Sequence, residues 1–133
     1  MLQSKMRRSL VATLAGLAIL VFAVPAALGR NTATPNAAAG KVTFTANCGT
    51  CHTLKASGSV GNIGPNLTDK TWLHGGKPAQ IFKTVNEGVL TKGMAAWGPQ
   101  LGTDKVQNVV AYVLTLKDTN VAGGKAPQGV EEP

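Results

Sequence analysis

The apolar positions along this chain predict short helices rather than a sheet. The clearest stripe starts at Thr103 and follows the i, i+3, i+4, i+7, i+8 spacing of a helix face that packs on a core. Its members are Val106, Val109, Val110, Val113 and Leu114. The opposite face is polar. No run of residues shows the alternation of apolar and polar positions that is typical of a half-buried strand.

Two further segments have helical signals. Residues 37–47 are rich in alanine and place Gly40 and Phe44 four apart, on one face of a helix. Residues 76–88 have a proline near the first turn and a glycine as the stop. Their inward apolar residues are Ile81, Phe82 and Val85.

A fourth, shorter helix is expected in the stretch LTDKTWLH, capped by Thr68 or Asp69. These segments together predict an all-α fold of three to five helices. After Leu116 the apolar periodicity ends, and residues 118–133 are expected to form an extended or loosely ordered tail.

The first 29 residues differ from the rest in their charge and apolar composition. Lys5, Arg7 and Arg8 precede an uncharged run from Leu10 to Gly29, the pattern of an export signal or a membrane anchor. Both alternatives stay open, and both place the later residues outside the cytoplasm, in the periplasm or an equivalent compartment. We expect a linker at residues 30–36, a domain at residues 37–117 and the tail after it.

A domain of this size builds a marginal core and usually needs additional stabilisation, such as disulfides or a bound metal. The chain has two cysteines, Cys48 and Cys51, and a disulfide between them would close too short a loop to stabilise much. The stretch CGTCH adds His52 directly after the second cysteine. This spacing is the attachment signature of haem c, in which both thiols bind porphyrin vinyl groups and the histidine ligates the iron.

Two other interpretations of this motif fit less well. A thioredoxin-like redox pair needs a βαβ setting, which a sequence poor in strand signals does not supply. A structural zinc site needs four ligands, and beyond Cys48, Cys51 and His52 only the distant His74 is of a suitable type. We therefore expect one covalent haem c.

The second axial ligand is expected to be Met94. It is the one methionine beyond the N-terminal segment, and it lies in a glycine-rich stretch from Gly88 to Gly102. Met/His ligation is common among electron carriers, and His74 is the less favoured alternative. Pro65, in GNIGPNL, offers a carbonyl that can orient the ring of His52.

With these motifs in order, the chain resembles class I c-type cytochromes over about residues 36–117. The shared features are CxxCH, GPNL and a methionine loop before a last helix, and the resemblance implies a small cytochrome c fold. It also implies that Gly40, Phe44 and Tyr112 mark the crossing of the first and last helices. GPNLTDKTWLHGG, MAAWG and VVAYVLTLK are most similar to the haem c domains in the dihaem subunit of cbb-type oxidases. Two departures are the single CxxCH and Ala95, where the family usually has proline.

These features predict a non-enzymatic protein that carries one electron between respiratory partners such as an oxidase, a reductase or a dehydrogenase. The alternative is a membrane-anchored haem c subunit of an oxidase or dehydrogenase complex. A haem enzyme or gas sensor would need an open iron site, which Met94 argues against. From Arg30 on the net charge is +4, with lysines scattered singly, so no nucleic-acid partner is expected. Lys55 and Lys92 are expected to rim the haem edge.

Overall fold

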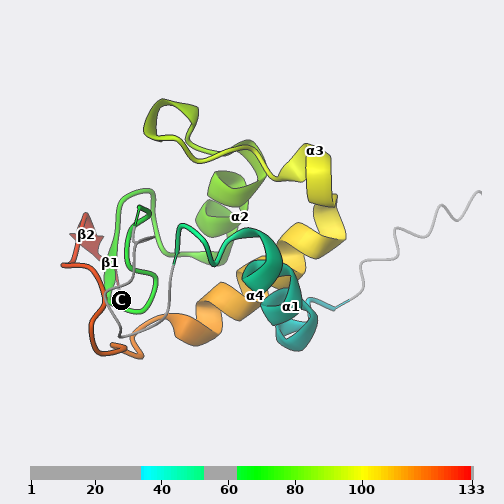
Figure 1. Cartoon of the computed structure of the whole chain (residues 1–133). Coiled ribbons are helices and arrows are strands. Elements are labelled where there is room, and N and C mark those ends of the chain that lie inside the picture. The colour runs from blue at the N-terminus through cyan, green and yellow to red at the C-terminus, as the bar shows by residue number, and fades with distance from the viewer. Residues whose placement is uncertain (1–33, 53–62, 133) are drawn as a thin grey trace, which may run out of the picture. The chain divides into compact units, whose positions relative to one another are not determined.

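The computed structural model describes residues 34–52 and 63–132, in which three helices build the core (Figure 1). They are α1 (Ala37–Asn47), α2 (Pro78–Glu87) and α4 (Thr103–Leu116). The predicted stripe of α4 is buried, because Val106, Val109, Val110 and Val113 all lie in the core. Phe44, Trp72, Ile81 and Val85 complete it. The three periodic helices of the sequence are thus present, and the fold is mostly helical.

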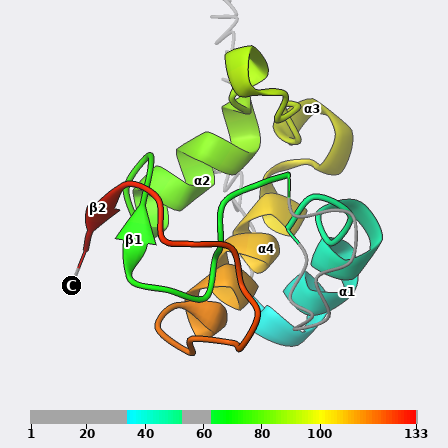
Figure 2. The ribbon, with the colours of Figure 1, turned by 60° about the vertical axis from the view of Figure 1, so that its left-hand side comes forward.

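α1 packs across α4 (Figure 2), and Gly40 lies at the contact. A Cβ on Gly40 would lie 1.8 Å from the backbone oxygen of Asn108, so the two backbones touch where only glycine fits. One turn along, the rings of Phe44 and Tyr112 pack edge to face, with centroids 5.3 Å apart. The Asn36 backbone N–H donates to Asn108 Oδ1 at 2.7 Å and ties the start of α1 to the same helix.

The glycine-rich stretch between α2 and α4 has more structure than a plain loop. It contains a 3-10 turn, η1 (Leu90–Lys92), and a short helix, α3 (Gly98–Leu101). The Trp97 N–H donates to the Val85 carbonyl at 3.0 Å and anchors the stretch on α2.

One expectation for the remaining segments was wrong. LTDKTWLH is not helical: Thr71–Trp72 form strand β1, paired antiparallel with β2 (Val130–Glu131). Asp69 Oδ1 accepts from both the N–H and the hydroxyl of Thr71 at 2.9 Å, a local pattern that competes with helix formation. The tail after Leu116 takes the extended one of its two expected forms, and its backbone is hydrogen-bonded to residues 68–72.

The expected signal or anchor at residues 1–29 and most of the linker lie outside the described residues. Among the helices that the structure describes, none has both the length and the apolar character to cross a membrane.

Candidate haem site

The CxxCH motif forms a tight turn at the end of α1. The N–H groups of Cys51 and His52 both donate to the Cys48 carbonyl, at 3.1 and 2.9 Å. The turn therefore presents two thiols and an imidazole within one loop, with Cys48 half-buried against the core and Cys51 exposed. This is the donor set that covalent haem attachment requires.

Burial and a neighbouring thiol keep the Cys48 thiol protonated at neutral pH. Burial, and then the neighbouring Cys51, raise its pKa to about 11. Redox-active cysteines have lowered pKa values, because the thiolate is the reactive species. Cys48 therefore lacks the lowered pKa of a nucleophilic redox cysteine. In the part of the chain that the structure describes, no three His, Cys, Asp or Glu residues cluster as a metal site.

The His52 ring is held from two sides. Its Nδ1 lies 3.1 Å from the Pro65 carbonyl oxygen. A carbonyl only accepts, so Nδ1 carries the proton and Nε2 is left for iron. Gly64 packs against the ring so closely that a Cβ there would lie 2.5 Å from Cε1. Burial lowers the pKa of His52, with the Pro65 bond opposing, and the ring is thereby kept in the neutral form that ligates a metal.

Met94 lies at the base of a closed loop. Its N–H donates to the Val89 carbonyl at 3.2 Å, and the Val89 N–H donates to the Met94 carbonyl at 2.9 Å. η1 forms the tip, and Gly93 with φ 82° turns the chain back toward Met94. The Met94 side chain is half-buried against the same core as Cys48.

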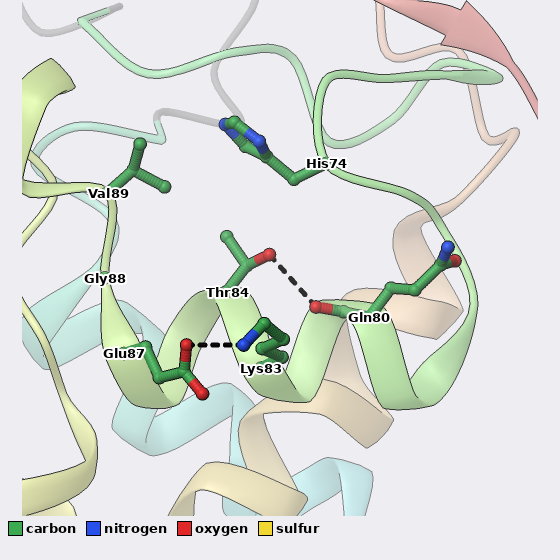
Figure 3. Close-up of a pocket in the computed structure, with 7 residues that line it drawn as sticks. All are labelled: His74, Gln80, Lys83, Thr84, Glu87, Gly88 and Val89. Carbon is green, nitrogen blue, oxygen red and sulfur yellow. Dashed lines mark hydrogen bonds and ion pairs between the residues drawn. The ribbon is translucent and has the colours of Figure 1, made fainter.

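His74 lines a hollow of about 360 Å³ on the side of α2 (Figure 3). Its ring points toward Val89, the backbone partner of Met94. The rest of the wall comes from Gln80, Lys83, Thr84, Glu87 and Gly88. Both candidates for the second axial ligand therefore lie near this hollow, and the choice between them stays a prediction.

No role for Trp72 was expected from the sequence. This indole is buried, with an Nε1–H that has no hydrogen-bond partner among the described residues. A buried donor without a partner is costly, so its presence points to an acceptor supplied by a bound group. Haem carries two carboxylates and fits this requirement. The sequence signal that could have identified Trp72 as a site residue is a tryptophan within a polar, glycine-rich loop.

The helices, the CxxCH turn and the oriented histidine define a class of protein, the small c-type cytochromes. The family described as "Cytochrome C oxidase, cbb3-type, subunit III" matches residues 35–113. Because this match covers more than half of the chain, the protein belongs to that family. It is accordingly an electron-transfer cytochrome that carries covalent haem c.

Similar proteins are named as subunits of cbb3-type cytochrome c oxidases. The Cbb3-type cytochrome c oxidase subunit FixP of Azorhizobium caulinodans is 41% identical over 85 residues, covering 62% of this chain and 28% of that protein. The subunit CcoP of Azospirillum sp. (strain B510) is 34% identical over 104 residues, covering 69% of this chain and 34% of that protein. The chain thus spans about a third or less of these relatives. A solved structure, cytochrome c6 of the diatom Phaeodactylum tricornutum, aligns with a TM-score of 0.49 and 31% identity, over 60% of this chain and 92% of that one.

Proposed function

We propose that this chain is a single-haem electron-transfer subunit of a cbb3-type oxidase, acting outside the cytoplasm. The observation that carries the proposal is the His52 ring, which is fixed by Pro65 beside two thiols, in a chain of the subunit III family. The free carrier expected first from the sequence becomes the second candidate, because the relatives are named as oxidase subunits.

In this proposal Cys48 and Cys51 hold the haem through thioethers, and His52 and Met94 ligate its iron. The haem supplies the one-electron chemistry. The Pro65 carbonyl fixes the His52 ring by accepting a hydrogen bond from its Nδ1–H. This hydrogen bond makes Nε2 a stronger electron donor to a metal. Trp72 donates to a carboxylate. If His52 and Met94 both ligated the iron, they would leave no open position on it for a substrate.

Haem attachment is tested by denaturing the purified protein and extracting it with acidified acetone. We expect the haem to stay with the polypeptide, and the variant with Cys48→Ala and Cys51→Ala to release it. Haem leaving the wild-type chain under these conditions would contradict the assignment of the two cysteines.

The closed iron site is tested by adding carbon monoxide to the ferrous protein at neutral pH. We expect no prompt binding, because Met94 occupies the sixth position. Prompt binding would favour the third interpretation, a gas sensor or haem enzyme with an open site.

The oxidase subunit and the free carrier differ in where the protein is found. A subunit anchored by residues 10–29 should sediment with membranes, retain its N-terminal segment by intact mass and co-purify with an oxidase. A free carrier should be recovered from the soluble fraction with the mass of a chain cleaved after Gly29.

A further inference from the structure

The chain after α4 folds back on the molecule. Asp118 and Asn120 have left-handed backbones, with φ values of 61° and 49°, a conformation that these two residue types tolerate well. Residues 118–132, here called the C-terminal strap, then run along residues 63–72 (Figure 2). Residues 63–72 contain both Pro65 and Trp72 and are called the Pro65 segment.

Backbone hydrogen bonds join the strap to the Pro65 segment along its length. The N–H of Asn120 donates to the Thr68 carbonyl at 2.8 Å, and the N–H of Glu132 donates to the Lys70 carbonyl at 2.9 Å. Between them, the strap carbonyl of Lys125 accepts from Asn66 Nδ2 at 3.2 Å. The β1–β2 pairing adds the contact between Trp72 and Val130. The strap thus contacts every second residue of the segment from Asn66 to Trp72.

Two strap glycines lie close against the segment, and Gly129 lies against its backbone. A Cβ on Gly124 would lie 2.6 Å from Asn66 Nδ2, and one on Gly129 would lie 2.3 Å from the Trp72 carbonyl oxygen. Gly129 also has a φ of 106°, which strongly favours glycine. These two contacts hold the strap backbone directly against Asn66 and Trp72.

The segment connects the strap to His52 through a single peptide unit. The Pro65 carbonyl that accepts from His52 belongs to the peptide bond between Pro65 and Asn66. Asn66 is held on both sides: its Oδ1 accepts from the Thr68 N–H at 2.9 Å, and its Nδ2 donates to the strap. Fixing Asn66 therefore fixes the orientation of the Pro65 carbonyl.

We infer that the C-terminal strap is a positioning element for the proximal histidine, which it orients through Asn66 and the Pro65 carbonyl. The inference deepens the proposed function, because it assumes that His52 is the iron ligand. The strap keeps the His52 Nδ1 proton bonded and shielded, and so sets how strongly this ring donates to the metal. A tail that only added stability would leave the reduction potential unchanged as long as the protein stays folded.

The test uses the haem-loaded full chain and a variant that ends at Lys117. Proton NMR of the ferrous protein follows the exchange of the His52 Nδ1 proton with D2O, at a temperature where circular dichroism shows each protein folded. We expect exchange at least about tenfold faster without the strap, since opening of the segment then requires fewer broken hydrogen bonds. The reduction potential should rise, because a less strongly bonded ring donates less to ferric iron.

Two glycine variants keep the test decisive if the shortened chain fails to fold. Gly129→Ala should accelerate the same exchange, because its methyl group collides with the Trp72 carbonyl. Gly102→Ala is the matched control: Gly102 also has positive φ, at 77°, but a Cβ there meets nothing within 4 Å. An unchanged exchange rate in the shortened chain, or equal rates in the two glycine variants, would overturn the inference. Failure of the proposed function is read separately, as a wild-type chain without covalent haem.

Discussion

His52 and Met94 are held by loops of different construction. His52 lies in a turn that continues α1 and is packed against Gly64 and Pro65, so its ring has a defined orientation and a defined proton. Met94 is fixed through its backbone, by two hydrogen bonds to Val89, and its flexible thioether is half-buried on the core. A substitution of the Met94 side chain therefore leaves the loop backbone in place, and its effects report on ligation.

Replacing Met94 by Ala should abolish the sulfur–iron charge-transfer band of the ferric protein in the far red. The reason is that Met94 is the one thioether among the residues beyond the N-terminal segment. The same variant should bind carbon monoxide promptly in the ferrous state. His74→Ala is the control and should keep the band. A band that survives Met94→Ala would transfer the ligand assignment to another group.

The stability of the domain should fall as the pH drops below about 6.5. The folded His52 has a lowered pKa, whereas in the unfolded chain an imidazole takes up its proton near pH 6.5. The unfolded state thus binds more protons in this range, so the free energy of unfolding decreases by up to roughly 1.4 kcal/mol per pH unit. Urea unfolding at pH 7.5, 6.5 and 5.5 measures this slope. Coordination of His52 to iron acts in the same direction.

The chain has one other imidazole, so His74→Asn is the matched variant for this titration. The slope should persist in it. A free energy of unfolding that is constant from pH 7.5 to 5.5 in the wild type, or a slope that vanishes with His74, would contradict the assignment to His52.

At the scale of elements, α1 and α4 depend on the absence of a side chain at Gly40. Gly40→Ala improves the intrinsic helix propensity of α1 by about 1 kcal/mol. It also drives a methyl group into the Asn108 backbone, which cannot move without shifting α4. Overpacking, at about 3 kcal/mol, should outweigh this gain, with a net loss of about 2 kcal/mol in the free energy of unfolding. Chemical unfolding followed by circular dichroism measures it.

Ala38→Gly provides the comparison on the exposed side of α1, where it should cost about 1 kcal/mol. The expected order, with the added methyl worse than the removed one, is the reverse of helix propensity. Gly40→Ala as stable as the wild type would mean that the two helices are not in backbone contact at this point.

The elements that the sequence predicted are those whose signals are local. α4 has its valines at helical spacing, and α2 begins with Pro78 and stops at Gly88, so both could be predicted from neighbouring residues. β1 and β2 could not, because each has two residues and exists only through pairing with a partner far along the chain. The same holds within the site. CxxCH and Met94 stand out as residue types, whereas the orphaned Trp72 N–H depends on tertiary burial.

At the scale of the molecule, charge and anchoring decide how the cytochrome meets its partner. On the surface Lys70 pairs with Glu131 at 3.8 Å, and Lys83 pairs with Glu87 at 2.7 Å. Such pairs reduce the positive electrostatic potential around them. Lys92 lies in η1, at the exposed tip of the Met94 loop. Lys55, the other lysine expected near the haem edge, lies outside the described residues.

The kinetic order of electron transfer separates the two forms of the proposed function. A subunit held in an oxidase should transfer its electron at a first-order rate that does not depend on protein concentration. A free carrier should show second-order kinetics that slow as salt rises from about 10 to 150 mM, where the Debye length falls from about 30 to 8 Å. Stopped-flow or flash photolysis on solubilised membranes, with and without added cytochrome, gives this order directly.

Charge reversal at Lys92 then locates the docking surface of a free carrier. Lys92→Glu should lower the second-order rate several-fold at low salt and leave the haem spectrum unchanged, because steering depends on charge near the contact. Lys41→Glu changes the net charge equally but lies exposed on α1, away from the Met94 loop in sequence. Its effect should be smaller. Equal effects of the two variants would assign steering to the net charge of the whole molecule, and a rate that is flat in salt would mean that docking is apolar.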